Sequence, residues 1–395
     1  MSHARARRRD RQVYLRSHPV LFALMAAARR RPTTRIGTTV LAHSRSAFTD
    51  GLTRIPLDRT AEGTTGGAAG RLTGGGLLFD QEGDDHRGSR RDLAESLGAD
   101  GVARLRPVWT DVLDRRLKPL ADGDPIDLVD VAAELSGATA AALLGLTVDP
   151  LELASAARAA AAAGAREHLP GLPFPRRRRA AEQAAARLNT LLAPSPDARL
   201  NAPLAPSPDA RLNAPPAPSP DARLNAPLAP PPDTGLAAML AVAAINTTVA
   251  GLPRAAAWCA DADLWAYVET APEALTGELL RVTAPTPLLP RSAAAPGTIA
   301  GRPIRRGDRL ILITRHAVNA HNHDPSPTAP APPHVAQLVF GVGPHACPGA
   351  RLARTQLLDA LTALAPYRPV VTRARASRRS ALPGWSSLII TATTC

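Results

Sequence analysis

The sequence has 395 residues, of which 45% are hydrophobic and 3% aromatic, so the chain is long enough to bury a large core. Its formal net charge is +13, and clustered arginines of this kind attract phosphate and carboxylate surfaces. Many alanines, prolines and arginines beside a single lysine, Lys118, are however typical of a GC-rich genome, and no aromatic-interleaved basic motif accompanies the charge. The composition therefore argues against a nucleic-acid-binding protein.

The first segment is strongly basic. Residues 1–17 contain the run "RARRRDRQVYLR", which predicts a solvated N-terminal arm. The apolar run "VLFALMAAA" at 20–28 follows, but a membrane span needs about 20 residues, and no cleavage site of small residues follows it. Three cysteines are too few for a disulfide framework. We expect a cytoplasmic protein without a membrane-spanning segment.

The rest of the chain is mostly helical in pattern. Apolar residues recur at spacings of three and four in six segments, 90–118, 129–146, 151–166, 176–192, 235–262 and 270–282. Strand patterns are short, and the clearest is "GTIAGRPIRRGDRLILI" at 297–313, which predicts a hairpin. We therefore expect a mainly α fold with small β-sheets, organised as a single domain over residues 18–395.

A tandem repeat interrupts the helices. The unit "APSPDARLNAPL" begins at Ala193, recurs with a period of 12, and decays after residue 228. Its prolines remove backbone donors and clash with a helix, and its apolar positions are too few for a solenoid core. Residues 193–233 are thus predicted to be a Pro-rich insertion without packed structure.

One cysteine lies in a distinctive loop, "FGVGPHACPGARLAR" at 340–354, with a helix predicted behind it. A lone cysteine after a glycine-rich turn is most often a small buried hydrophobic residue. The start of a helix also stabilises a thiolate, because its backbone N–H groups favour negative charge, and glycines let other atoms approach closely.

This stretch is similar to the haem-binding loop of the cytochromes P-450, the haem-thiolate monooxygenases. The family pattern Phe-Gly-x-Gly-x-His/Arg-x-Cys-x-Gly is matched at all six positions, namely Phe340, Gly341, Gly343, His345, Cys347 and Gly349. The resemblance implies that Cys347 ligates the iron of haem b, so that its thiolate favours O–O cleavage. It also implies that His345 meets a haem propionate.

Further motifs follow in the family's order. "GELLR" at 277–281 resembles the Glu-x-x-Arg pair through Glu278 and Arg281, although alone it would be an ordinary i, i+3 ion pair. Arg291 resembles the family's propionate-binding arginine. His86 and Arg90, one helical turn apart, resemble its His-x-x-x-Arg helix, whose cations also face the propionates.

The segment "LAVAAINTTVAGLPRAAAW" at 240–258 resembles the family's central helix, which lies on the oxygen side of the haem. Thr247 is retained, but the acid of the family pattern is replaced by Asn246. An amide binds water but does not titrate. Either Thr247 and ordered water deliver the protons, or the substrate completes the relay, or the enzyme is slow or peroxide-driven. A plain alternative is that the Asn-Thr-Thr stretch only bends the helix, helped by Pro253.

Two other segments depart from the family. Residues 325–339 lack the aromatic-arginine motif that completes the Glu278–Arg281 triad, and His334 is a possible substitute. The repeats occupy a region where the family has helices that cover the substrate pocket, so this cover is expected to be abbreviated. Leu77, Leu78, Ile245 and Leu288 are candidates for the pocket walls.

The resemblance implies a bacterial monooxygenase that oxidises a small organic molecule, plausibly in secondary metabolism, with dioxygen and with electrons from a ferredoxin or flavoprotein reductase. Thr247 and Asn246 are the expected catalytic residues. A catalytically impaired haem-binding or scaffold protein of the same fold is the alternative. No partnership with nucleic acid or a membrane is expected.

Overall fold

The structure is a computed structural model that describes residues 3–64, 66–67, 70, 83–168, 175–193, 234–378 and 380–393. At a few of these positions, including His86 and His345, it describes the backbone alone. The α-helices are α1 (His3–Ser17), α2 (Pro19–Ala28), α3 (Arg45–Thr53), α5 (Gly83–Leu97), α6 (Ala99–Ala121), α7 (Leu128–Leu143), α8 (Pro150–His168), α9 (Pro175–Leu192), α12 (Thr234–Ala262), α13 (Tyr267–Thr270), α14 (Pro272–Thr283), α15 (Thr314–Ala317), α16 (Pro333–Ala336) and α17 (Ala350–Leu364). Short 3-10 helices are η2 (Gln337–Phe340), η3 (Gly343–His345) and η4 (Ala365–Tyr367).

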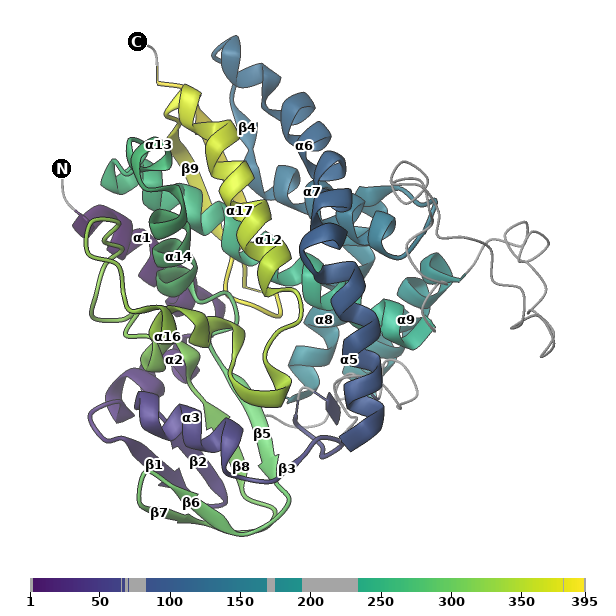
Figure 1. Ribbon diagram of the computed structural model, residues 1–395, viewed down its shortest axis with the longest axis vertical. Coiled ribbons are helices and arrows are strands. Elements are labelled where there is room, and N and C mark those ends of the chain that lie inside the picture. The colour runs from purple at the N-terminus through teal and green to yellow at the C-terminus, as the bar shows by residue number, and fades with distance from the viewer. Residues whose placement is uncertain are drawn as a thin grey trace, which may run out of the picture.

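Three small sheets accompany the helices. A five-stranded sheet has the order β1 (Thr33–Ile36), β2 (Thr39–Ala42), β8 (Arg309–Leu312), β5 (Leu289–Ala293) and β3 (Leu57–Asp58). A three-stranded sheet has the order β4 (Ile126–Asp127), β10 (Trp385–Thr391) and β9 (Val370–Ala376), and β6 (Gly297–Ile299) pairs with β7 (Arg302–Ile304). In Figure 1 the five-stranded sheet lies at one end of the molecule, with α3 packed across it. The mainly α fold with small sheets is therefore confirmed.

Helix α12 runs through the centre of the fold and contacts α1, α7, α8, α9 and α14 (Figure 1). It is the one helix in the described ranges that is long and apolar enough to cross a membrane, and 56% of its most apolar window is buried. Ile245, Ala255 and Cys259 on it are fully buried in the main hydrophobic core. Its apolar sequence is thus that of a core helix with neighbours on most sides.

The expected helices are found within a few residues of their bounds, with one exception. The pattern at 90–118 predicts a single helix, whereas the chain forms α5 and α6 with a break at Gly98. Gly98 has extended backbone at the first turn of α6, and a Cβ atom there would lie 2.5 Å from the carbonyl oxygen of Ala94. Glycine therefore permits a change of direction that the continuous apolar pattern conceals.

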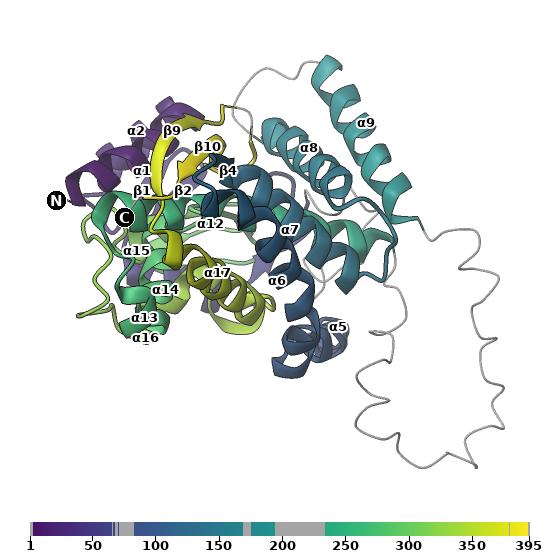
Figure 2. The ribbon, with the colours of Figure 1, turned by 90° about the horizontal axis from the view of Figure 1, so that it is seen from above.

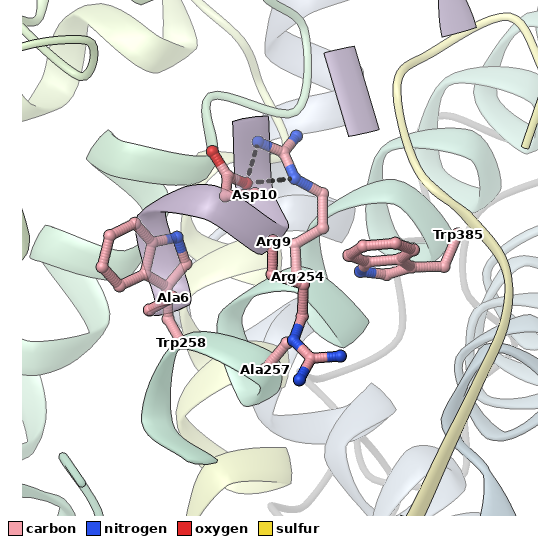
Figure 3. Close-up of a pocket in the computed structure, with 7 residues that line it drawn as sticks. All are labelled: Ala6, Arg9, Asp10, Arg254, Ala257, Trp258 and Trp385. Atoms are coloured by element: carbon pink, nitrogen blue, oxygen red, sulfur yellow. Dashed lines mark hydrogen bonds and ion pairs between the residues drawn. The ribbon is translucent and has the colours of Figure 1, made fainter. Parts of the chain in front are cut away.

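The expectation of a solvated arm at 1–17 is wrong for residues 3–17, which form the packed helix α1. Asp10 on α1 is 5% exposed and accepts hydrogen bonds from Arg254 Nε (2.8 Å) and Nη2 (2.6 Å) on α12. Trp258 and Trp385 lie beside this ion pair (Figure 3). The basic run has acidic and apolar partners far along the chain, which a local charge count does not detect.

The ring of Tyr14 completes the attachment of α1. Its hydroxyl donates to the carbonyl oxygen of Thr283 at 2.7 Å and accepts from Arg254 Nη2 at 2.6 Å. The guanidinium carbons of Arg254 and Arg315 lie 4.6 and 4.1 Å from the ring centroid, a cation–π arrangement. Three segments of the chain are thus joined at one buried side chain.

The hairpin predicted at 297–313 is shorter than expected. β6 and β7 pair over residues 297–304, with Ala300 and Gly301 at positive φ in the turn between them. β8 instead joins β2 and β5 in the larger sheet, where it is parallel to β2. The predicted insertion at 193–233 lies outside the described residues except for Ala193.

Candidate functional site

The Cys347 loop lies between η3 and α17. The backbone N–H of Cys347 donates to the carbonyl oxygen of Phe340 at 2.7 Å, which closes the loop on itself. Gly343 has φ +79°, and a Cβ atom there would lie 3.3 Å from the Thr53 methyl group at the end of α3. Glycine is therefore required both by the backbone conformation and by the close approach of α3.

The Cys347 side chain is exposed at the start of α17. The protein around it raises the pKa of the thiol by desolvation, while the Gly349 N–H and the charge of Arg90 act in the opposite direction. A Cβ atom on Gly349 would lie 3.9 Å from the sulfur, in ordinary van der Waals contact. The loop thus presents an accessible sulfur with a hydrogen-bond donor and a cation that favour its thiolate form.

Arg90 connects α5 to this loop. Its Nη1 donates to the carbonyl oxygen of Ala346 at 2.7 Å, directly before Cys347. Phe340 is half-buried, and the guanidinium carbon of Arg354 on α17 lies 4.9 Å from its ring centroid. Helices on both sides therefore hold the loop by cationic side chains.

Glu278 and Arg281 on α14 form a buried ion pair, 2% exposed each, with Nε to Oε1 at 2.8 Å and Nη2 to Oε2 at 2.6 Å. Burial alone would raise the pKa of Glu278, but hydrogen bonds from Arg281 and from the backbone N–H groups of Ala331 and Ser326 lower it. The pair belongs to the core and not to a surface helix turn.

Backbone groups complete the pair in place of an aromatic-arginine motif. Arg281 donates to the carbonyl oxygens of Val318, His323 and Asp324, the last at 2.9 Å. His334 is exposed and makes none of the bonds to the pair, so the interpretation of His334 as a substitute is wrong. The segment 318–331 wraps the ion pair with its main chain, and this requires no particular side chain.

Arg291 lies on β5. Its Nη1 donates to the carbonyl oxygen of Pro290 at 2.8 Å, and its pKa is lowered to about 10 by burial and by the charge of Arg59. Strand pairing between β3 and β5 explains the proximity, because Asp58 lies opposite Ser292. Two guanidinium groups therefore approach each other in the interior, where an anion would offset their repulsion.

Thr247 and Asn246 lie near the middle of α12, and both are half-buried. Thr247 Oγ1 donates to the carbonyl oxygen of Ala243 at 2.8 Å. Asn246 Nδ2 donates to the carbonyl oxygen of Val242 at 2.8 Å and reaches that of Ala157 on α8 at 3.4 Å. The Asn246 amide thus contacts both its own helix and the neighbouring α8.

The structure brings together Arg90 and the four predicted loop residues Phe340, Gly341, Cys347 and Gly349. Thr247 and Asn246 lie on α12, and Arg291 lies on β5 beside Arg59. The side chains of His86 and His345 lie outside the description, as do Leu77 and Leu78. Ile245, a candidate for the pocket wall, is instead fully buried in the main core.

Sequence reasoning missed Arg59 and Arg354. Arg354 lies within the recognised loop sequence, but nothing in its spacing indicates that it covers Phe340. Arg59 becomes relevant only through the β3–β5 pairing, which joins segments more than 200 residues apart. No local pattern reports either contact.

The residues present fit a haem group on two counts. Cys347 offers an accessible sulfur flanked by the Gly349 N–H and Arg90, which is the environment a metal-bound thiolate requires. Arg59 and Arg291 place two cations together, which is suited to a carboxylate such as a propionate. The thiol and the two guanidinium groups are thus the kinds of side chain that bind the iron and the propionates of haem.

Solved structures with a similar fold are cytochromes P450. CYP108D1 from Novosphingobium aromaticivorans shares 21% identity over 96% of this chain and 95% of its own, with a TM-score of 0.68. A mutant of P450 EryK in complex with erythromycin B shares 21% over 96% and 98%, with a TM-score of 0.71. CYP109E1 from Bacillus megaterium in complex with testosterone shares 17% over 97% and 100%, with a TM-score of 0.71.

No protein-family model matches the sequence, and no curated protein matches it as a relative. The likeness therefore lies in the path of the chain, which is shared over almost its whole length. The protein has the cytochrome P450 fold.

Proposed function

We propose that the protein is a cytoplasmic haem-thiolate monooxygenase that oxidises a small organic molecule with dioxygen, using electrons from a ferredoxin or flavoprotein reductase. The observation that carries the proposal is the Cys347 loop, an accessible thiol between Arg90 and the start of α17 in a P450 fold. When bound, haem b supplies the redox chemistry that activates dioxygen. A role in secondary metabolism is part of the same proposal.

Cys347 would hold the iron as a thiolate. Desolvation opposes loss of its proton, and the Gly349 N–H and the positive charge of Arg90 partly compensate. The hydrogen bond from Arg90 to the Ala346 carbonyl also fixes α5 against the loop, which limits the directions in which the sulfur can move. The protein thereby positions the ligand before any group binds.

Cationic side chains would hold the propionates. Arg291 and its neighbour Arg59 provide guanidinium groups whose repulsion a carboxylate relieves. His86, Arg90 and His345 are further proposed donors, carried over from the family motifs. Several cationic donors are needed because haem b carries two propionates.

Thr247 and Asn246 would assist the delivery of protons to dioxygen. The Thr247 hydroxyl donates to its own helix, which leaves its oxygen lone pairs to accept from water or substrate. Asn246 uses its NH₂ group on the Val242 and Ala157 carbonyls, so the side-chain oxygen remains as an acceptor. Neither group exchanges a net proton near neutral pH, so a proton would pass through water that they orient.

The engagement of Asn246 also favours a second candidate, a haem-binding or scaffold protein with impaired turnover. A residue that joins α12 to α8 has a structural use independent of catalysis. The two candidates differ in product formation with a redox partner. They agree on haem binding through Cys347.

The test is the absorption spectrum of the reduced protein with carbon monoxide. We expect one non-covalent haem b and the red-shifted Soret band of thiolate ligation, which Cys347→Ser abolishes. Cys259→Ala, in the buried core, and Cys395→Ser are the matched controls and retain the band. A band that survives Cys347→Ser would refute the ligand assignment, and a protein that binds no haem would refute both candidates.

A further inference from the structure

A hollow lies beside the five-stranded sheet. It has a volume of about 360 Å³ and is bounded by the end of α2, the start of α3 and the segment around α15. Helix α3 has nine residues and is roughly 13 Å long at 1.5 Å per residue. Its opposite end approaches Gly343 of the Cys347 loop, so this hollow is separate from the site described above.

The walls of the hollow are cationic. Arginines 29, 30, 31 and 45 line it and are exposed, and no aspartate or glutamate occurs among its described lining residues. None of these arginines forms an ion pair with any side chain in the described part of the chain. Ser44 and Arg45 lie at the N-terminus of α3, the positive end of a helix dipole.

Three histidines form the inner part of the hollow. His43 is 3% exposed and His316 9%, and their Nδ1 atoms lie 3.0 Å apart, so one of them donates to the other. The rings of His316 and His321 are 4.7 Å apart between centroids. His43 Nε2 and His321 Nδ1 are buried and have no hydrogen-bond partner within the described residues.

These unpartnered nitrogens require an explanation, because buried polar atoms are nearly always hydrogen-bonded. When His316 donates in the Nδ1 pair, neutral His43 carries its proton on Nε2, where an external acceptor could bind it. The cations Arg29 and Arg315 lie close enough to influence the cluster electrostatically, so they oppose a metal ion and favour an anion. No metal-type cluster of His, Cys, Asp and Glu is found in the described ranges.

We propose that this hollow binds a phosphate group, held between the guanidinium groups of Arg29 and Arg45 and the imidazoles of the histidine cluster. Guanidinium groups bind phosphate oxygens in pairs, and several of them match a dianion better than a singly charged carboxylate. The volume exceeds that of inorganic phosphate alone and suits a small phosphorylated molecule.

Burial determines the charge of the histidine cluster. It lowers the pKa of His43 to about 4, of His316 to about 3 and of His321 to about 4. The charges of His321, His43, Arg315 and Arg29 lower the pKa of His316 further. Those of Arg29, Arg315 and His323 do the same for His321, which a backbone hydrogen bond at Arg315 partly offsets. The imidazoles are therefore neutral at pH 7. Neutral imidazoles offer N–H donors without adding charge, so the arginines supply the positive charge that attracts the dianion.

Two sources provide this phosphate chemistry. One is a free phosphorylated molecule, and the other is the headgroup of an anionic lipid, because Val20 and Leu24 on the adjoining α2 are 72% and 59% exposed. The probes are therefore inorganic phosphate, measured by calorimetry, and vesicles of phosphatidylglycerol compared with phosphatidylcholine, measured by flotation.

The test compares the double variant Arg29→Gln/Arg45→Gln with Arg306→Gln/Lys118→Gln, which removes the same charge at exposed positions outside the hollow. We expect the first to weaken binding by about ten-fold or more, since charge-assisted bonds are lost, and the second to leave it nearly unchanged. Phosphate should also shift the side-chain NMR signal of His43, which superficial binding would not do.

Each outcome bears on the proposal. Binding of inorganic phosphate that depends on Arg29 and Arg45 supports a free ligand, and binding of phosphatidylglycerol vesicles alone with the same dependence supports a headgroup. Equal loss in the two double variants, an unmoved His43 signal, or no binding of either probe overturns it. His43→Gln, with its fold checked by circular dichroism, should weaken binding if the buried nitrogen is a donor.

Discussion

Asn246 determines what can be expected of proton delivery. Its amide donates to the Val242 and Ala157 carbonyls and does not titrate. We expect Asn246→Asp to raise the product formed per reduced nicotinamide severalfold, since general acid–base assistance is worth about 10²-fold or more in good geometry. Thr247→Ala should lower the same ratio.

The measurement uses the three proteins with one redox partner and one substrate. Tight coupling in the wild type together with a lower ratio in Asn246→Asp would contradict this expectation. Asn246 would then be a tuned part of the mechanism, and its bond to α8 would be the first contact to examine.

The Asp10–Arg254 pair gives a prediction about stability. Arg254→Met leaves a buried carboxylate with only Arg315, 3.4 Å away, so we expect a loss of about 3–5 kcal/mol in the free energy of unfolding. Asp10→Leu/Arg254→Met should recover a large part of that loss, because the buried carboxylate is removed as well and the partly exposed Arg315 keeps its hydrogen bond to the Val282 carbonyl. Urea denaturation measures both variants. If the double variant is as unstable as Arg254→Met alone, the loss of stability comes from altered packing and not from the unpaired charge.

At the residue scale, the sequence predicts features that depend only on residues close together in the chain. The cysteine loop was recognisable because glycines and a cysteine at fixed spacings encode one backbone conformation. The partner of Arg291 was not predictable, since it depends on β3 pairing with β5. The replacement of the aromatic-arginine motif by main-chain groups left no side-chain pattern to detect.

At the element scale, the helices around the core follow their apolar periodicity closely. α7, α8, α9, α12 and α14 begin and end within a few residues of the expected bounds, because each buries its apolar residues against its neighbours. α1 was missed since arginines dominate its composition. Only contacts with α12 and α14 reveal that Asp10, Val13 and Tyr14 are its buried face.

The Pro-rich repeats lead to a prediction about their removal. Deleting one period, residues 205–216, shortens the connection between α9 and α12, which end and begin at Leu192 and Thr234. A change in loop length of this size costs only tenths of a kcal/mol to about one. We therefore expect the melting temperature and the haem content to change little. Loss of folding or of haem would show that the repeats are packed structure.

At the scale of the whole molecule, the fold was predictable and the sheet that β8 joins was not. The mainly α class follows from the helical periodicity, and the P450 fold agrees with the resemblance of the cysteine loop. β8, however, leaves the predicted hairpin for the larger sheet, because its alternating residues Leu310 and Leu312 are buried there. Which sheet a strand joins depends on strands that are distant in the sequence. Figure 2 shows the packed helices of the same fold seen from above.

The buried histidines predict acid sensitivity of the entire fold. His43, His316 and His321 have pKa values of about 4, 3 and 4, below the value of about 6.5 in an unfolded chain. The unfolded state therefore binds more protons below about pH 6.5, so stability falls as the pH falls. Melting temperatures between about pH 7 and pH 5 measure this slope, above the range where carboxylates dominate.

His316→Gln should flatten that slope, whereas His334→Gln, an exposed control, should not change it. An unchanged slope in His316→Gln would mean that the cluster is not the source. Added phosphate offers an independent comparison, because a ligand that binds only the folded state raises the melting temperature by mass action.

The attachment of α1 has a consequence for biosynthesis. Asp10 and Arg254 are 244 residues apart in the chain, and the acceptor of the Tyr14 hydroxyl follows it by 269 residues. At about 5–20 residues per second, α1 leaves the ribosome on the order of ten seconds or more before either partner exists. During that interval its arginines are exposed, and so are the side chains that the folded protein buries. A helix that is made early is thus among the last to reach its native contacts.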